Sequence, residues 1–241
     1  MTMLRLHKIF RYSPSKFTVL LGFLLLQIFL TPIAGKTIFL QQILYFYTYL
    51  VLLSAVTAIV ESKAKLRIFV IFYITSFICS VLFFRDNSIH WLAMSEASDV
   101  VMIAIAIWGI LIFMRKQKKV TRDLISGAIC IYMLCGLLWA NGYSLCMLYD
   151  RGAISGIDLS ESIFGVRNLL VYFSYVTMMT IGYGDMLPAN SMARALVMLQ
   201  GLFGQMYLAV FVAGAIGMFL SQRDENKIIE KIEEDVKLRK H

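Results

Sequence analysis

The sequence predicts an all-α membrane protein whose chain crosses the bilayer six times. Of the 241 residues, 59% are hydrophobic and only 16% are charged, whereas about half of the residues in a soluble domain are apolar and about a quarter are charged. The apolar residues also gather in six stretches, each long enough to cross about 30 Å of hydrocarbon as a helix. Both observations indicate a protein that lies mainly in lipid.

The first stretch, residues 17–34, follows a polar and basic segment, residues 1–16, that we expect in the cytosol. A basic start followed by an apolar run is also the pattern of a signal peptide. We favour a retained helix, because the apolar run is long for the core of a signal peptide.

Five further stretches complete the predicted spans, at residues 38–60, 68–84, 98–114, 124–148 and 193–220. We interpret the segment before the fourth span, up to about Glu96, as a polar loop with Trp91 as an interfacial anchor. Asp99 then lies near the outer end of the fourth span, and we favour an interfacial position over a functional carboxylate. Another apolar segment, residues 168–179, is too short to cross the bilayer.

The distribution of Lys and Arg predicts that both termini are cytosolic. In that orientation, the cytosolic segments carry 18 of the 23 basic residues and the opposite side carries 5. An excess of Lys and Arg in cytosolic loops is typical of membrane proteins. It accounts for the net charge of +8 without nucleic acid, which would need basic residues on a water-facing surface. We therefore expect a multi-pass protein of the plasma or inner membrane.

The sequence contains no pattern typical of an enzyme or a metal centre. No nucleophile and base stand at a catalytic spacing, and the three histidines lie outside the apolar spans. The four cysteines lie in apolar runs without CxxC spacing, which favours buried thiols that pack as small hydrophobic groups. They are Cys79, Cys130, Cys135 and Cys146. We predict no enzymatic activity and no cofactor.

The most informative segment is Thr180-Ile181-Gly182-Tyr183-Gly184-Asp185, here called the filter segment. It resembles the selectivity filter of potassium channels, in which backbone carbonyls replace the hydration shell of the ion. Turning successive carbonyls to one side requires backbone angles that residues with a Cβ resist, so alternating glycines are favoured. A polar turn is the alternative interpretation. An apolar segment of helical length before the motif and a membrane span after it favour the filter.

The resemblance implies a potassium channel of the voltage-gated-like superfamily, of prokaryotic type, with six helices and one pore loop per subunit. Residues 168–179 then match the re-entrant pore helix of the family. Permeant K⁺ would bind at Thr180, Ile181, Gly182 and Tyr183, with Gly184 completing the filter. Irregular backbone at membrane depth needs protein or a cavity around it, and one chain supplies one filter segment. A homotetramer follows from this need and from the resemblance.

The residues beside the filter segment depart from the pattern of the family. Tyr172 and Phe173 stand where tryptophans are common on the pore helix, and we expect the Tyr172 hydroxyl to donate to Asp185 behind the filter. Val176 stands where some channels keep a buried glutamate, which removes one partner of Asp185. Met179 replaces a common threonine, and we expect it to face the central cavity.

The chain is predicted to divide into a four-helix domain, residues 17–119, and a pore domain, residues 120–221. In the superfamily, the fourth span carries a basic residue at every third position, and each charge that crosses the field contributes about 2.3 kcal/mol per 100 mV. Residues 100–114 contain no basic residue. We therefore expect a sensor-like domain without gating charges, and weak or absent voltage dependence.

Basic residues follow the fourth span, where they favour a cytosolic position and a contact with anionic lipid. They are Arg115, Lys116, Lys118 and Lys119.

The sixth span contains a candidate hinge. Gly204 stands at the offset from Gly184 at which the family has the hinge glycine of its inner helix, and glycine weakens a helix by about 1 kcal/mol relative to alanine. Close packing of helices is the alternative at this position, and it is our prediction for Gly214 and Gly217.

The charged tail, residues 222–241, is predicted to be a cytosolic helix. Its apolar residues at four-residue spacing permit a short four-stranded bundle, and a solvated charged helix fits the pattern equally well. They are Ile228, Ile232 and Val236.

The sequence therefore predicts passive conduction of K⁺ through the filter segment. A weakly selective cation channel of the same architecture is one alternative. A non-conducting regulatory or scaffold subunit of the membrane is the other.

Overall fold

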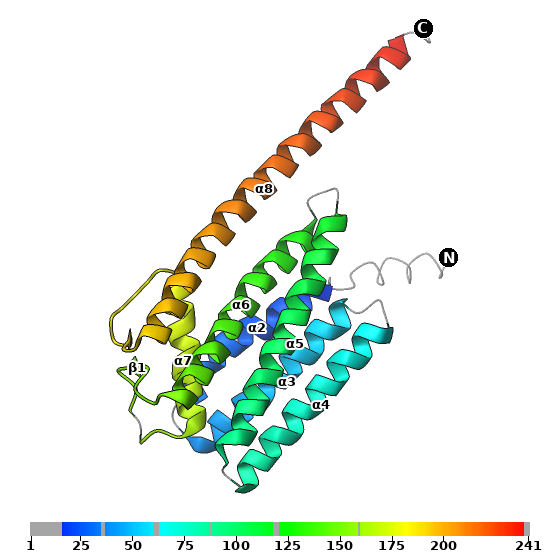
Figure 1. Ribbon diagram of the computed structural model, residues 1–241. Coiled ribbons are helices and arrows are strands. Elements are labelled where there is room, and N and C mark those ends of the chain that lie inside the picture. Colours follow the sequence, from blue (N-terminus) through cyan, green and yellow to red (C-terminus); the bar gives the residue numbers. More distant parts are fainter. Residues whose placement is uncertain are drawn as a thin grey trace.

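The computed structural model describes residues 16–34, 37–59, 63–86, 88–117, 121–158 and 160–238. Within these residues the chain forms seven α-helices and one pair of two-residue strands (Figure 1). This predominantly helical structure is consistent with the predicted all-α membrane class.

The first four helices form one group, which lies beside the rest of the chain in Figure 1. They are α2 (Lys16–Ala34), α3 (Ile38–Ile59), α4 (Lys63–Asp86) and α5 (Ile89–Lys116). Helix α2 packs against α3, and α4 packs against α5, while α3 also contacts α5. The group covers the residues of the predicted four-helix domain, whose separation from the pore domain stays a prediction.

The second group consists of three helices and the strand pair. Its elements are α6 (Arg122–Tyr149), β1 (Ile154–Ser155), α7 (Ile163–Met178), β2 (Leu187–Pro188) and α8 (Ser191–Leu238). The two strands pair antiparallel, with Ile154 opposite Pro188. This pairing joins the loop after α6 to the chain that leaves the filter segment. Helix α8 extends far beyond the other helices (Figure 1).

The two groups share one hydrophobic core. Helices α2 and α5 both pack along α6, and α3 contacts α7. Phe17 and Leu20 of α2 are buried in the same cluster as Ile131 and Leu134 of α6. Helix α2 thus contributes to this core, and its retention stays a prediction. The four cysteines are buried free thiols, as predicted.

Three helices in the described part of the chain are long and apolar enough to cross a membrane: Ile89–Lys116, Asp123–Tyr149 and Ser191–Phe211. The others have shorter apolar segments, at Phe17–Ile33, Phe39–Ala55, Arg67–Phe83 and Ile163–Met178. The chain thus contains helices fit for a multi-pass membrane protein.

Two helices begin earlier than the sequence predicts. Helix α5 starts at Ile89, directly after Ser88, so the predicted polar loop up to Glu96 is wrong. Helix α7 starts at Ile163, because Ser162 caps it by accepting a hydrogen bond from the backbone N–H of Gly165 at 3.0 Å. In both cases, buried polar partners described below allow charged residues to lie inside a helix.

The predicted sixth span and the charged tail form one continuous helix, α8. The expected bundle contacts of Ile228, Ile232 and Val236 lie outside the residues whose side chains the structure describes.

Candidate functional site

The filter segment begins where α7 ends, and backbone hydrogen bonds fix the turn between them. The N–H of Thr180 donates to the carbonyl of Thr177 at 3.0 Å, and the N–H of Ile181 donates to the carbonyl of Val176 at 2.9 Å. The chain then runs without regular structure to β2. A short helix thus positions the first residues of the filter segment directly.

Three residues of the filter segment have a positive φ, at alternating positions. They are Thr180 (57°), Gly182 (59°) and Gly184 (82°). Glycine adopts this region without steric cost, which confirms the reason that the sequence gives for the two glycines. A positive φ is rare for a β-branched residue and costs on the order of 1–3 kcal/mol.

Side-chain contacts hold Thr180 in this conformation. Its hydroxyl donates to the carbonyl of Met179 at 2.7 Å and accepts from Nε2 of Gln205, on α8, at 3.3 Å. The inner end of the filter segment is thus tied to helix α8.

The carbonyl oxygens of residues 180–184 accept no hydrogen bond from any described residue of the chain. All five residues are exposed in the single chain, and Tyr183 retains 71% of its accessible surface. Backbone carbonyls at membrane depth require a partner. The filter segment therefore presents a row of acceptors that the described chain leaves free.

The predicted support behind the filter segment is present on α7. The hydroxyl of Tyr172 donates to Oδ2 of Asp185 at 2.8 Å, which is the hydrogen bond that the sequence predicts. Phe173 is buried against Tyr143 of α6, with 5.1 Å between the ring centroids. Val176 is also buried and offers Asp185 no polar partner.

A polar network that sequence reasoning missed holds α7 to α6 and α8. Gln200 of α8 is fully buried and donates through Nε2 to the carbonyl and the hydroxyl of Ser174, both at 2.8 Å. The Tyr143 hydroxyl donates to Oε1 of Gln200 at 2.5 Å, and the Ser174 hydroxyl donates to the carbonyl of Gly136 at 2.6 Å. The only sequence signal is a glutamine within an apolar span, and the span holds a second one, Gln205, which is exposed in the chain.

Gly204 allows α8 to approach the end of α7. A Cβ at this position would lie 2.5 Å from the carbonyl oxygen of Met178. The structure thus gives Gly204 a packing role, while the hinge stays a prediction. At Gly214 and Gly217, a Cβ would meet no described atom outside its own helix backbone within 4 Å, so packing there stays a prediction.

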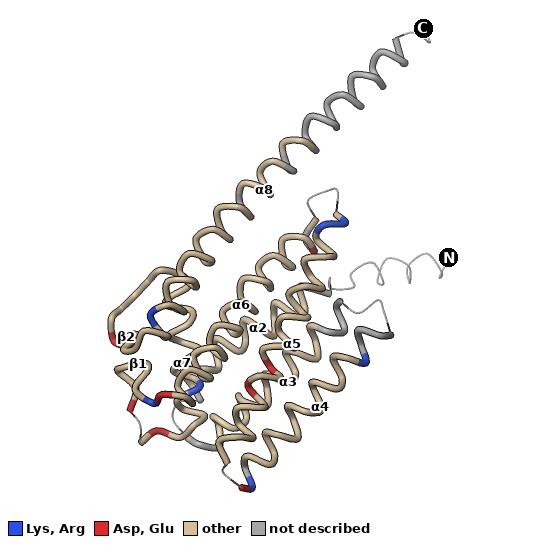
Figure 2. The backbone as a smooth tube through the Cα atoms, viewed as in Figure 1, with Lys and Arg blue, Asp and Glu red and all other residues tan. Residues whose placement is uncertain are grey.

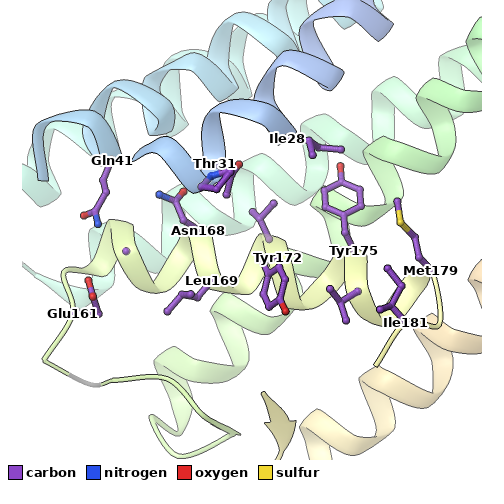
Figure 3. A pocket seen from close by; sticks show the side chains of 14 residues that line it. Ile28, Thr31, Gln41, Glu161, Asn168, Leu169, Tyr172, Tyr175, Met179 and Ile181 are labelled. Carbon is purple, nitrogen blue, oxygen red and sulfur yellow. The ribbon is translucent and has the colours of Figure 1, made fainter. Parts of the chain in front are cut away.

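A cavity of about 560 Å³ lies between α7 and the first two helices. Gln41, Glu161 and Asn168 line one end, and Met179 and Ile181 line the other (Figure 3). The sequence predicts that Met179 faces the central cavity. In this chain its side chain lines the cavity between α7 and the first two helices. The reason is the turn after Met178, which places Met179 beside Ile181 on the α2 side of α7.

Two buried carboxylates of α5 hold an arginine of α7. Nη1 of Arg167 contacts Oε1 of Glu96, and Nη2 lies 3.1 Å from Oδ2 of Asp99. The exposed fractions of the Arg167, Glu96 and Asp99 side chains are only 11%, 1% and 2%. The guanidinium carbon also lies 4.7 Å from the ring centroid of Tyr45, a cation–π contact. In Figure 2, acidic positions interrupt the otherwise uncharged middle of α5.

A group of buried hydroxyls continues this ion cluster into α3 and α4. The Ser76 hydroxyl donates to Oδ1 of Asp99 at 2.6 Å. The other hydroxyls lie 2.7–3.4 Å from one another or from Ser76. They belong to Tyr45, Tyr49, Ser80 and Ser95. Asp99 is therefore buried among polar partners, which the sequence analysis did not expect, while its depth in the membrane stays a prediction.

The loop after α6 is fixed at its start by Asp150. Its Oδ1 accepts from the N–H of Gly152 at 2.9 Å and its Oδ2 from Nδ2 of Asn190 at 2.8 Å. These hydrogen bonds, that of Asn190 first, favour the carboxylate and hold the pKa of Asp150 below its ordinary value. Asn190 in turn caps α8 by accepting from the N–H of Ala193.

The basic residues predicted to contact lipid are described only in part. Arg115 and Lys116 are exposed at the end of α5, while Lys118 and Lys119 lie outside the described residues. Within the described chain, no three metal-ligating side chains come together.

A comparison with protein families finds a similarity at the same part of the chain. Residues 168–221 match the protein-family model described as an ion channel. They include most of α7, the filter segment and the first part of α8.

A curated relative, two-pore potassium channel 5 of Arabidopsis thaliana, is 27% identical over 110 residues, which is 46% of this chain and 25% of the relative. The chain thus spans about a quarter of the length of this relative. No solved structure matches. The region that carries the site is therefore similar to an ion channel.

Proposed function

We propose that this chain is one subunit of a homotetrameric potassium channel. Four filter segments surround one axis, and K⁺ passes along carbonyl sites formed by Thr180, Ile181, Gly182 and Tyr183, with Gly184 at the outer end. One observation carries the proposal: a row of unpaired carbonyls follows a short helix, with glycines at alternating positive φ angles. This is what a filter of backbone carbonyls needs.

The tetramer is supported by what a single chain leaves unsatisfied. The filter carbonyls have no partner within the described chain, and apolar side chains of α8 beside the filter segment are exposed. They include Met198, Leu199, Leu202 and Met206. Further copies around one axis would cover part of this surface and complete the ion path.

The proposed topology has six spanning helices, with both ends in the cytosol and α7 entering the membrane without crossing it. The α5–α6 turn and the extension of α8 lie toward the same end of the molecule (Figure 1). The basic residues Arg115 and Lys116 lie at this end, where we propose that they contact anionic lipid, together with Lys118 and Lys119. The filter segment then opens toward the outer face.

We propose that conduction depends weakly, if at all, on voltage. Helix α5 carries no basic residue between Ile89 and Met114 except His90 at its start. Its two buried acids are tied to Arg167 of the pore helix, so a sliding movement of α5 would break buried ion pairs. Voltage-steep opening needs several charges that cross the field, and α5 does not supply them.

Potassium flux into liposomes that contain the purified protein tests the proposed function. We expect flux in the wild type, none in Gly182→Asp, and a strong reduction in Gly182→Ala, because a Cβ resists a φ of 59°. The matched control is Gly142→Ala, the same change at a helical site with no atom within 4 Å of the new Cβ, which should keep the flux. A folded wild type without flux would favour a non-conducting regulatory subunit.

A weakly selective cation channel is a second candidate. The observation that favours it is the sparse polar support behind the filter: among the described residues, Tyr172 alone donates to the Asp185 carboxylate, and Val176 adds nothing polar. Reversal potentials in mixed sodium and potassium separate the two candidates.

A further inference from the structure

The ion cluster of Glu96, Asp99 and Arg167 contains one carboxylate more than its single guanidinium can balance. Among the described residues, no second cation contacts either acid. A buried charge without a partner is very costly, and such a group normally takes up a proton. Charge balance at this site therefore requires one proton on one of the two acids.

The hydrogen bonds of the two acids are unequal. Both oxygens of Asp99 accept, Oδ1 from Ser76 and Oδ2 from Arg167, and the buried hydroxyls around Ser76 strengthen that arrangement. Only Oε1 of Glu96 contacts Arg167, while Oε2 is buried without a hydrogen-bond partner. Hydrogen-bond donors favour the ionised form of an acid. Asp99 is therefore the acid that stays ionised, and Glu96 is the acid that holds the proton.

We infer that Glu96 is a proton-binding site that controls how the pore helix α7 is held against α5. With its proton, the cluster is neutral, and Arg167 is shared between Glu96 and the ionised Asp99. When Glu96 releases the proton, two negative charges stand one helical turn apart in a buried site, and only one cation balances them. The position of α7, which ends on the filter segment, then changes with pH. The effect on conduction rests on the proposed function, whereas proton binding does not.

The groups that face Glu96 come from every neighbouring helix. Arg167 of α7 and Asp99 of α5 are the charged ones, and Tyr45 of α3 is the other titratable one, while Tyr49 lies near Asp99. Ser144 of α6 lies beside the carboxyl. Ser144 and Arg167 also line a cavity of about 170 Å³ whose wall includes the exposed Arg151. This cavity offers a path by which the proton exchanges with water at the end of the helices.

Infrared spectroscopy of the purified protein tests the proton directly. The wild type at neutral pH should show the C=O band of a protonated carboxylic acid, shifted by deuterium exchange, and Glu96→Gln should lose it. Asp99→Asn should lose it as well, because Glu96 then becomes the ionised partner of Arg167. The control Asp86→Asn removes an exposed carboxylate at the end of α4 and should keep the band. A wild type without the band, or Glu96→Gln with it, would overturn the inference.

The pH dependence of thermal stability gives a second test, because the melting temperatures of the wild type and of Asp99→Asn should change with pH in opposite directions. Stability falls as pH rises wherever the folded state holds more protons than the unfolded state. The melting temperature of the wild type should therefore fall as the pH rises above the ordinary carboxyl pKa of about 4.3 and level off once Glu96 has lost its proton in the folded state, and Glu96→Gln should lose this fall. In Asp99→Asn, the melting temperature should instead fall as the pH is lowered, because protonation of Glu96 leaves Arg167 without a charged partner. An unchanged profile in both variants would contradict a proton on Glu96.

Potassium flux measured across the same pH range tests the link to conduction. We expect the flux of the wild type to change where its melting temperature changes, and the flux of Glu96→Gln to lose this response. If Glu96→Gln responds to pH as the wild type does, the link to the filter is wrong. If the infrared band belongs to Glu96 but the wild type conducts no potassium, the proton site stands and the proposed function fails.

Discussion

At the scale of single residues, the filter segment depends on a few contacts with precise partners. Thr180 is held at a positive φ by bonds to Met179 and Gln205, and Asp185 is held by Tyr172. These contacts lie at the two ends of the filter segment. Single substitutions there should change conduction more than stability.

Tyr172→Phe should alter conduction without unfolding the protein. The change removes the hydrogen bond to Asp185, whose net contribution is about 1 kcal/mol, and leaves the aromatic ring. We expect faster decay of the potassium current in planar bilayers. Tyr149→Phe is the matched control, because Tyr149 is 95% exposed. Identical currents in both variants would count against a role for Tyr172.

Asp150 should make stability depend on acid pH. Its lowered pKa means that the contacts with Asn190 and Gly152 favour folding above its ordinary pKa. Their contribution is lost as the pH falls through the lowered pKa of the folded state. Asp150→Asn should therefore lower the melting temperature at neutral pH and flatten its fall toward acid. The comparison is with the exposed Asp86→Asn, and equal profiles for the two variants would refute the role of Asp150.

At the scale of elements, α7 is the part that the rest of the molecule positions. Hydrogen bonds of Ser174 and Gln200 join it to α6 and α8, and ion pairs of Arg167 join it to α5. Gly204 allows α8 to pack against its end. A helix held on several sides places the filter segment within a narrow range.

Gly204→Ala should destabilise the protein by about 1–3 kcal/mol, the usual cost of overpacking. The new Cβ would overlap the carbonyl oxygen of Met178, which is backbone and cannot move away alone. Gly22→Ala in α2, where nothing lies within 4 Å of the new Cβ, is the control and should not destabilise. Thermal unfolding in detergent measures both. A stable Gly204→Ala with altered gating would instead favour the hinge.

Gln200→Leu should cost about 1–3 kcal/mol, because it leaves the buried Tyr143 hydroxyl and the Ser174 carbonyl without their partners. Denaturation of the purified variant in detergent measures the loss. The control is Gln205→Leu, since Gln205 is exposed in the chain. If both variants are equally stable, the network does not anchor α7.

At the scale of the whole molecule, the sequence predicted much of the helical fold but not how its parts are joined. The predicted bounds of α3 and α6 are close to those observed, because long apolar runs end at charged or polar residues. The start of α5 and the burial of Asp99 could not be predicted, because Arg167 lies far along the chain. Gly182 and Gly184 were identified through the resemblance of the filter segment to potassium channels, and their positive φ angles fit the backbone role expected of them there.

The measurement that tests the central claim most directly is the reversal potential of single channels in planar bilayers. Purified protein is recorded with potassium on one side and sodium on the other, and the voltage is varied. A potassium filter at residues 180–184 predicts a reversal potential far from zero, with the sign set by potassium leaving its own side; this should be lost in Gly182→Ala and kept in Gly142→Ala, with little dependence of opening on voltage. A reversal potential near zero, or steeply voltage-dependent opening, would contradict the account.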